Sequence, residues 1–400
     1  MRSKQVGVVL VGVPDITGGG GAERYFVELC QAVGCLGKRC DTTLISDVES
    51  LSHLASATPV SDIKQVLALD LDRVGGPARQ RFSIAAGLRD IATSGKFDVL
   101  HIAMALPRHL LWLLPLRKSR KRCQITLNLN DYRLSRMLSP AGGGESVLQL
   151  GATQRASYSA YFRWAPLDGV MSWYEDVAEG LRGRYGARFA PVTVADYCFV
   201  DPEKFRPTSK SIPLLVYVAR LVPEKRPELF LRSLAVVREI DPEGFARWQY
   251  KLFGKGPLEG EVRRLIVELG LSDQVQLDSA PDLSAVFGAA SVFVSTQDHE
   301  NFTSLSMLEA MACANAVVAR DVGRTERFVE HGRNGVLVSD HSPHALGAAI
   351  HELIGDPVKV RRYGEESRRI VLETHSAENV VAEFEQFWCD GVGRTGRDVP

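Results

Sequence analysis

The fold is decided by residues 291–321, SVFVSTQDHENFTSLSMLEAMACANAVVARD. This stretch opens with an apolar, β-branched run at residues 292–294, which predicts a buried strand. A polar loop follows at residues 297–302, and the apolar spacing after it predicts a helix over residues 303–314. A second β-run at residues 316–319 completes a strand–loop–helix–strand unit.

Polar side chains gather in the loop and at the start of the predicted helix. Glu300 lies in the loop, Glu309 lies on the helix, and Thr303, Ser304 and Ser306 crowd the helix start. First-turn N–H groups and the helix dipole favour an anion at that end, while carboxylates accept hydrogen bonds from hydroxyl groups. The unit therefore suits a phosphorylated, hydroxyl-rich ligand. The alternative is an ordinary helix cap with two solvated glutamates.

The composition indicates a globular protein of ordinary charge. The chain has 400 residues, enough for about two or three domains. Lysine plus arginine and aspartate plus glutamate are equal at 48 each, which argues against a dedicated nucleic-acid binder. The apolar run near the N-terminus is interpreted as a first strand rather than a signal peptide, and no run is long enough to span a membrane.

The cysteines show no metal-binding or redox spacing. They form no C-x-x-C pair, and none has a histidine at zinc spacing, so reduced thiols in a cytoplasmic protein are expected. The seven positions are Cys30, Cys35, Cys40, Cys123, Cys198, Cys313 and Cys389.

The first half alternates strand and helix patterns, which predicts a mostly parallel sheet covered by helices. A strand at residues 6–13 leads into a glycine run that contains Gly19, Gly20 and Gly21, and a helix is expected at residues 22–33. A glycine loop between strand and helix lets the backbone approach a ligand at the carboxyl edge of a sheet, although a flexible loop is the alternative. The other predicted strands are 42–46, 66–71, 99–103, 124–129, 170–173 and 192–197.

A Pro-containing polar stretch at residues 201–211 predicts a linker. After it, the alternation of strand and helix patterns begins again. We therefore expect two Rossmann-like, doubly wound α/β domains at residues 1–200 and 201–375, with a ligand cleft between the carboxyl edges of their sheets. A helix at 376–390 and a disordered tail at 391–400 end the chain. The strands expected in the second domain are 214–218, 250–253, 275–277, 292–294, 316–319 and 336–338, and the helices are 227–240, 259–269, 283–289, 303–314, 343–354 and 358–373.

Two further loops of the second half follow strands directly. Arg220 and Lys225 flank a Pro-containing turn, and two cations at a strand end suit a diphosphate leaving group. Gly254 and Gly256 follow the next strand and permit close backbone approach to a ligand. The alternatives are a solvated basic loop and a tight turn, respectively.

These segments together resemble the family-four retaining glycosyltransferases, which have the two-domain GT-B fold. The matching segments are ARLVPEKR, FGKGPLEGEVRRLIVELGLSDQVQ, HENFTSLSMLEAMACANAVVARDVG and FVEHGRNGVLV, in the family's order, and they cover most of residues 214–338. The first half matches more thinly, through GGGGAERY and DVLHIA.

The resemblance implies a role for each matching residue. Arg220 and Lys225 would hold the donor diphosphate, Glu300 would lie beside the donor sugar, and Glu309 would bind the ribose of the nucleotide. The glycine run would line the cleft from the opposite side, and the last helix would return to the first domain. The residues whose backbone would contact sugar and phosphate are Asn301, Phe302, Thr303, Ser304 and Leu305.

This chain departs from the family pattern at three places. One is Arg324, which stands where the family commonly has a second glycine and bears on the donor pocket or the acceptor. Eight residues separate Glu300 from Glu309, one more than the family spacing. An extra residue in the loop preserves both roles, whereas counting back strictly from Glu309 places Asn301 in the role of Glu300. Where the family often has a histidine, this chain has Asn130 followed by Asp131, and an asparagine can orient a hydroxyl but cannot act as a base.

A retaining enzyme needs no side-chain base if the departing phosphate accepts the acceptor's proton. Asn130 and Asp131 are acceptor-side candidates, as is His101 at the end of a predicted strand, although a buried histidine is the favoured interpretation there. Asp70 and Asp72 resemble the metal-binding acids of the other glycosyltransferase fold, but we interpret them as solvated strand-end residues. No metal or cofactor is therefore expected.

The expected function is metal-independent, retaining transfer of a sugar from a nucleotide-diphosphate sugar to a hydroxyl acceptor, which is a glycan, a lipid-linked group or a small molecule. Residues 110–122 pair an apolar run with basic residues, so they either rest weakly on an anionic membrane or form a core helix and a solvated loop. The alternatives are a nucleotide-sugar epimerase of the same fold and a nucleotide-sugar-binding subunit without catalysis.

Overall fold

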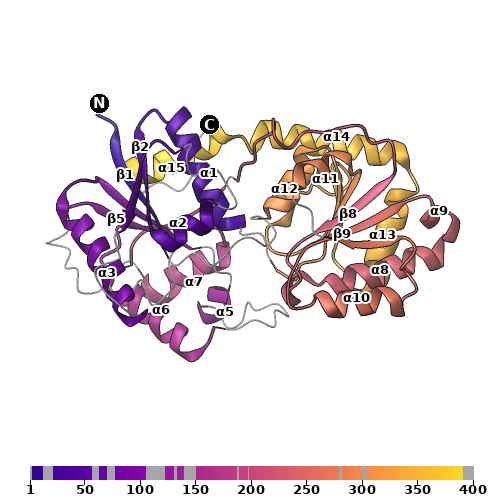
Figure 1. Cartoon of the computed structure of the whole chain (residues 1–400), viewed down its shortest axis with the longest axis horizontal. Helices are drawn as coiled ribbons and strands as arrows, with labels where there is room; N and C mark the ends of the chain where they lie inside the picture. The colour runs from indigo at the N-terminus through magenta and orange to yellow at the C-terminus, as the bar shows by residue number, and fades with distance from the viewer. Residues whose placement is uncertain are drawn as a thin grey trace. The chain divides into compact units, whose positions relative to one another are not determined.

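The computed structural model describes residues 2–11, 21–55, 63–69, 77–104, 122–129, 133–138, 150–186, 189–196, 198–278, 282–299 and 304–390 (Figure 1). Within these residues the chain divides into two compact α/β units. The first holds the described residues up to Asp196 and those from Glu378 onward, and the second holds those between.

The first unit is built on a parallel sheet. Its described strands are hydrogen-bonded in the order β3-β2-β1-β4-β5-β6-β7, and each neighbouring pair is parallel. The strands are β1 (Lys4–Leu10), β2 (Cys40–Asp47), β3 (Val66–Leu69), β4 (Val99–Met104), β5 (Gln124–Leu129), β6 (Gly169–Ser172) and β7 (Val192–Val194). The helices are α1 (Gly21–Leu36), α2 (Val48–Ala55), α3 (Pro77–Ser94), α5 (Arg133–Leu138), α6 (Ala152–Trp164), α7 (Glu175–Tyr185) and α15 (Ala377–Asp390).

The second unit repeats this plan with a parallel sheet in the order β10-β9-β8-β11-β12-β13, counted over its described residues. Both orders reverse beside the first strand of the unit, which is the doubly wound Rossmann arrangement that the alternating patterns predicted. The strands are β8 (Leu214–Val218), β9 (Gln249–Phe253), β10 (Val275–Asp278), β11 (Val292–Ser295), β12 (Ala316–Arg320) and β13 (Gly335–Val338). The helices are α8 (Pro227–Ile240), α9 (Pro242–Ala246), α10 (Glu259–Glu268), α11 (Leu283–Ala289), α12 (Leu305–Ala312), α13 (Pro343–Ile354) and α14 (Pro357–Thr374).

Three helices of the second unit start in the same way. Asp241, Ser342 and Asp356 are N-cap residues whose side chains accept a hydrogen bond from a first-turn N–H of α9, α13 and α14, respectively. A proline follows each cap at the first helical position, where its missing N–H costs nothing and its fixed φ suits the helix. These starts are therefore encoded locally in the sequence.

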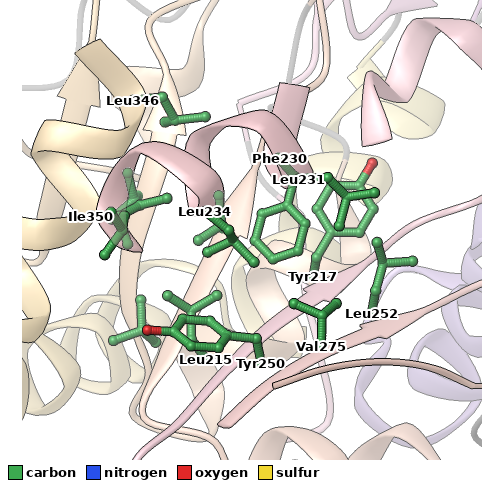
Figure 2. Packing of buried hydrophobic residues seen from close by; sticks show 14 of the residues in the cluster. Leu215, Tyr217, Phe230, Leu231, Leu234, Tyr250, Leu252, Val275, Leu346 and Ile350 are labelled. Carbon is green, nitrogen blue, oxygen red and sulfur yellow. The ribbon is translucent and has the colours of Figure 1, made fainter. Parts of the chain in front are cut away.

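The core of the second unit lies between its sheet and the helices α8 and α13. Figure 2 shows Phe230, Leu231 and Leu234 of α8 packed over side chains of β8 and β9. The rings of Tyr217 and Phe230 stack with their centroids 5.0 Å apart. Burial of a side chain of this size stabilises the fold by about 1.5–3 kcal/mol, so this face of α8 accounts for much of the helix's stability.

The last helix, α15, belongs to the first unit, although the preceding helix α14 belongs to the second. Lys4 Nζ of β1 donates to the carbonyl oxygens of Trp388 and Cys389 at 3.1 Å each. Glu385 accepts hydrogen bonds from the backbone N–H groups of Arg39 and Cys40 at 2.6 and 2.8 Å. In Figure 1 the yellow α15 lies beside β1 and α1.

Residues 201–211, expected to form a linker, are instead bound to the second unit. Thr208 N donates to the carbonyl of Gly288 at 3.0 Å, and Lys210 Nζ donates to the carbonyl of Ala314 at 2.5 Å. The carbonyl of Phe205, whose side chain is buried, accepts from Arg368 at 3.2 Å. Prolines and polar residues mark irregular backbone, but they do not distinguish a free linker from a segment fixed by such contacts. Among the described helices, none is both long and apolar enough to cross a membrane.

Candidate active site

The second sheet has a topological switch point between β8 and β11. The chain leaves β8 through α8 to reach β9 on one side, and it leaves β11 through α12 to reach β12 on the other. In open α/β sheets, ligands bind outside the carboxyl ends of the strands at this position. The segments that follow the two strands, residues 219–226 and 296–304, are therefore the candidate site.

Lys225 lies at the centre of the contacts between these segments. Its carbonyl oxygen accepts hydrogen bonds from Tyr217 Oη at 2.7 Å and from Thr296 Oγ1 at 2.8 Å. Its ammonium group donates to Gln297 Oε1. Contacts at both ends hold the half-buried side chain of Lys225 in one place.

The surroundings of Lys225 lower the pKa of its ammonium group. Burial, together with the positive charge of Arg220, lowers the pKa of Lys225 from 10.5 to about 8, against the opposing effect of Glu224 and Asp298. Burial disfavours the charged form of an amine, and a neighbouring cation adds to this effect. An anion that enters the site therefore stabilises the charged form of Lys225 more than it would stabilise an exposed lysine.

The loop after β8 has a conformation that its neighbours impose. Arg226 has a left-handed backbone with φ of 51°, which is unusual for a residue other than glycine. Its carbonyl accepts a hydrogen bond from Thr296 Oγ1 at 2.9 Å, and its Nε pairs with Glu228 at 2.5 Å. Asp298 N donates to the carbonyl of Glu224 at 3.1 Å, so the loops after β8 and β11 form one hydrogen-bonded structure. Such strained residues concentrate at functional sites.

Three residues of this structure were not predicted as site residues: Thr296, Gln297 and Arg320. Arg320 ends β12, is only 2% exposed, and donates to the carbonyl oxygens of Thr296 and Gln297 at 3.4 and 3.3 Å. The signal available in the sequence was the position of Thr296 and Gln297 directly after a buried strand. Polar residues there were assigned to the loop as a whole.

Gly254 and Gly256 approach the backbone of the loop that contains Arg220. A Cβ on Gly254 would lie 1.9 Å from the carbonyl oxygen of Ala219, and one on Gly256 would lie 2.4 Å from that of Leu221. Leu221 N also donates to the carbonyl of Lys255 at 2.9 Å. The glycines are therefore required for packing of the two loops, whether or not a ligand contacts them.

The helix after β11 is shorter than predicted. It runs over Leu305–Ala312 with Ser304 as its N-cap, rather than over residues 303–314, and Ala314 takes a left-handed conformation with φ of 56°. This turn lets the chain enter β12 at Ala316, which the periodicity of the helix did not reveal. The Ser304 side chain accepts no hydrogen bond from its own helix. Glu309 lies inside α12 and is 1% exposed.

Some candidates fall outside the described residues: Gly19, Gly20, Asp70, Asp72, Asn130, Asp131, Glu300, Asn301, Phe302 and Thr303. The same holds for residues 110–121 of the candidate membrane segment. Gly21 is the first residue of α1, which follows β1 at the switch point of the first sheet.

His101 is buried in the first unit, which is the interpretation that the sequence favoured. Its Nδ1 lies 2.9 Å from Thr126 Oγ1, and its ring packs edge-on against Phe384, Phe387 and Trp388 of α15, with centroid distances of 5.5–5.9 Å. Burial lowers the pKa of His101 to about 3, so the ring is neutral at pH 7. In the described parts of both units, no group of three or more His, Cys, Asp or Glu side chains could hold a metal ion.

Comparison with known proteins identifies the chemistry of this fold. Residues 212–356, which include the switch point of the second sheet, match the family described as Glycosyl transferases group 1. The chain is a glycosyltransferase that resembles the group 1 family over these residues. The matched residues of this glycosyltransferase contain the Lys225 and Gln297 loops and α12.

Relatives of this glycosyltransferase differ in how much of their length it covers. The D-inositol 3-phosphate glycosyltransferase of Thermobispora bispora is 27% identical over an alignment of 372 residues, which covers 86% of this chain and 84% of that protein. The exopolysaccharide phosphotransferase of Streptomyces coelicolor is 33% identical over 204 residues, which are 50% of this chain but only 21% of that protein. The D-inositol 3-phosphate glycosyltransferase of Nocardiopsis dassonvillei is 32% identical over 209 residues, 48% of each chain.

Solved structures confirm the GT-B fold of this glycosyltransferase. Sucrose-phosphate synthase from Thermosynechococcus elongatus aligns with a TM-score of 0.73 at 19% identity, over 97% of this chain and 98% of that one. Anabaena HepE in complex with UDP-glucose aligns with a TM-score of 0.70 at 19% identity, over 95% of this chain and 99% of that one.

Proposed function

We propose that this glycosyltransferase moves a sugar from a nucleotide-diphosphate sugar to a hydroxyl acceptor with retention of configuration. The observation that carries the proposal is the hydrogen-bonded pair of loops at the switch point of the second sheet. They hold Lys225 between Tyr217, Thr296 and Gln297, with Arg220 close enough to lower its pKa.

The cations of this site suit the diphosphate of the donor. When the bond between sugar and phosphate breaks, negative charge develops on the departing diphosphate. Lys225 and Arg220 stabilise that charge, and because contacts already fix Lys225, little reorganisation is needed during the reaction. The N-terminus of α12, where the Ser304 side chain accepts no hydrogen bond from its own helix, offers N–H groups to the same anion.

The remaining donor contacts follow the sequence prediction. Glu309 would accept hydrogen bonds from the ribose hydroxyls, and Glu300 would lie beside the donor sugar. The backbone amides of residues 301–305 would contact the sugar and the phosphate. The packed glycines Gly254 and Gly256 shape the floor of the donor site. In the complex of HepE with UDP-glucose, a protein of this fold binds such a donor.

On the acceptor side, Asn130 and Asp131 orient the attacking hydroxyl. His101 is fully buried, so it is not assigned a contact with that hydroxyl. The departing phosphate accepts the acceptor's proton on the same face of the sugar, which requires neither a side-chain base nor a metal ion. The names of the relatives make D-inositol 3-phosphate the first acceptor to test.

The test measures transfer and compares two buried lysines. Lys225 and Lys210 are both half-buried in the second unit, and burial lowers the pKa of each to about 8. Lys210 donates to Ala314 and is not part of the candidate site. With UDP-glucose and D-inositol 3-phosphate as first substrates, we expect Lys225→Ala to reduce kcat/KM by about 100-fold or more, and Lys210→Ala to change it by about twofold or less. Equal losses in both variants would refute the site assignment.

Product analysis separates the alternatives. NMR of the product shows whether the anomeric configuration is retained, and unchanged turnover in EDTA supports the metal-independent reaction. Conversion of the donor in the absence of any acceptor would indicate an epimerase. Nucleotide binding without transfer across a panel of acceptors would indicate a non-catalytic subunit.

The peripheral membrane contact through residues 110–122 has its own measurement. If these residues rest on an anionic membrane, the protein co-sediments weakly with vesicles that contain anionic lipid and not with neutral vesicles. A core helix followed by a solvated loop predicts no co-sedimentation with either kind of vesicle. Equal recovery in the supernatant with both kinds of vesicle would remove the membrane contact and leave the transfer reaction unaffected.

A further inference from the structure

Two cysteines far apart in the sequence touch in the first unit. Cys40 opens β2, and Cys389 lies in the last turn of α15, 349 residues further along the chain. Their Sγ atoms are 3.3 Å apart. A disulfide needs a sulfur–sulfur distance of about 2.05 Å, so the two sulfurs must approach by about 1.3 Å, which is within the reach of side-chain rotation.

The backbone around both cysteines is already fixed. The carboxylate of Glu385 on α15 accepts hydrogen bonds from the backbone N–H groups of Arg39 and Cys40. Lys4 of β1 donates to the carbonyl of Cys389 from the other side. A bond between the sulfurs would therefore join two elements that are already docked, and no rearrangement of the helix is required.

The two thiols differ in accessibility. Cys40 is only 3% exposed, whereas Cys389 is half-buried and lies within electrostatic reach of the Arg39 guanidinium, which itself pairs with Asp390. An oxidant dissolved in water therefore meets Cys389 first.

Cys40 has the opposite surroundings. Burial, the contact with Cys389 and the carboxylate of Glu385 all raise the pKa of Cys40, so its thiol stays protonated at neutral pH. Cys40 is therefore a poor first nucleophile, but it is placed to attack an oxidised sulfur at position 389. The high pKa predicts that this second step accelerates as the pH rises.

We propose that Cys40 and Cys389 are an oxidisable pair, and that hydrogen peroxide converts their contact into a disulfide that fastens α15 to β2. The Cys389 sulfur attacks one peroxide oxygen, the O–O bond breaks, and the released hydroxide leaves as water with the thiol proton. The Cys40 sulfur then attacks the resulting sulfenic acid, the S–O bond breaks, and the hydroxide leaves as a second water with the Cys40 proton. Two thiols are oxidised by two electrons, and one peroxide is reduced to two waters.

The disulfide would close nearly the whole chain into one covalent loop. A loop of this length removes much conformational freedom from the unfolded chain, so the bond stabilises the unit in which both cysteines lie. We expect the melting temperature of the first unit to rise by about 5 °C. This inference does not depend on the proposed transfer reaction.

The experiment uses the full chain, reduced, freed of reductant and then treated with hydrogen peroxide. We expect the number of titratable thiols in denaturant to fall from seven to five, because two of the seven cysteines are consumed. Trypsin digestion without reductant should yield one linked species that joins residues 40–64 to residues 370–394, each of which contains a single cysteine. Dithiothreitol should reverse both changes and the gain in melting temperature.

Two serine variants supply the controls. Cys389→Ser changes a half-buried side chain at the end of a helix, so it should fold normally but lose the linked peptide and the thermal shift. Cys35→Ser removes an exposed cysteine of the same unit and should retain both. The proposal is overturned if peroxide produces sulfinic acid at position 389 without the linked peptide, or if the Cys389→Ser variant gains the same stability on oxidation.

Discussion

The depressed pKa of Lys225 makes donor binding sensitive to pH in a defined direction. In the free protein the pKa is lowered from 10.5 to about 8, mainly by burial and then by Arg220. Between these two values the folded protein binds fewer protons than the unfolded chain, so the unfavourable burial of the ammonium is fully present below pH 8 and is relieved as the pH rises toward 10.5. A bound diphosphate supplies the opposite charge and stabilises the ammonium instead.

The size of the effect follows from the protonated fraction of Lys225. With a pKa of about 8, about 90% of the side chain is charged at pH 7 and about 10% at pH 9. If the diphosphate binds only the charged form, its affinity falls about tenfold between these values, which corresponds to about 1.4 kcal/mol. The last phosphate proton has a pKa of about 6, so the charge of the diphosphate itself changes little in this range.

The assay is calorimetric titration of UDP at pH 7, 8, 9 and 9.5. The control is Lys225→Arg, because a guanidinium keeps its charge throughout this range. We expect the wild type to lose affinity above pH 8 and the arginine variant, whatever its absolute affinity, to stay level. A flat profile in the wild type would refute the reasoning, and so would a parallel decline in both proteins.

Three further predictions concern packing, the nucleotide and the buried histidine. Gly254→Ala places a Cβ 1.9 Å from the Ala219 carbonyl oxygen and should destabilise the protein by about 1–3 kcal/mol in urea unfolding, whereas Gly260→Ala, with nothing within 4 Å, should be neutral or stabilising. Glu309→Gln should weaken UDP binding about tenfold and leave pyrophosphate binding within about twofold, because the proposed contact is to the ribose; equal losses for both ligands would argue for a structural role. The pKa of His101 is depressed from 6.5 to about 3, so its neutral form contributes stability above pH 6.5 that is lost as the pH falls toward 3, at up to about 1.4 kcal/mol per pH unit. His101→Phe should therefore show a shallower loss of stability in acid, and an unchanged slope would exclude His101 as the cause.

The elements of this fold were largely predictable because buried parallel strands are continuous apolar runs. The predicted bounds of the strands Gln124–Leu129 and Leu214–Val218 and of the helix Leu283–Ala289 agree with the structure. Each run is short, rich in β-branched or large apolar residues, and bounded by polar residues or turn signals. Local composition therefore specifies the type of each element.

The predictions that differed depended on contacts outside the local segment. The helix after β11 ends at Ala312 because Ala314 turns left-handed to lead the chain into β12, and no residue in the helix marks that turn. The polar stretch around Lys210 was expected to be a linker, but it binds carbonyl groups of the second unit that come much later in the chain.

In the candidate site, too, some residues could be predicted from the local sequence and others depend on contacts between distant segments. Arg220 and Lys225 could be chosen because cations directly after a strand stand at the carboxyl edge of a sheet. Gln297 could not be chosen, because its contact with the Lys225 ammonium joins residues 72 positions apart. The burial that lowers the pKa of Lys225 is likewise a property of the folded unit.

The sequence by itself determined which segments become strands and helices and which loops carry charge, because these depend on periodicity and on residues within a few positions of one another. Only the tertiary structure decided that β8 lies next to β11, and thereby which loops meet at a switch point. It also decided that Cys40 touches Cys389. Such contacts depend on the order in which strands pair and helices dock, and that order is fixed by packing the whole chain at once.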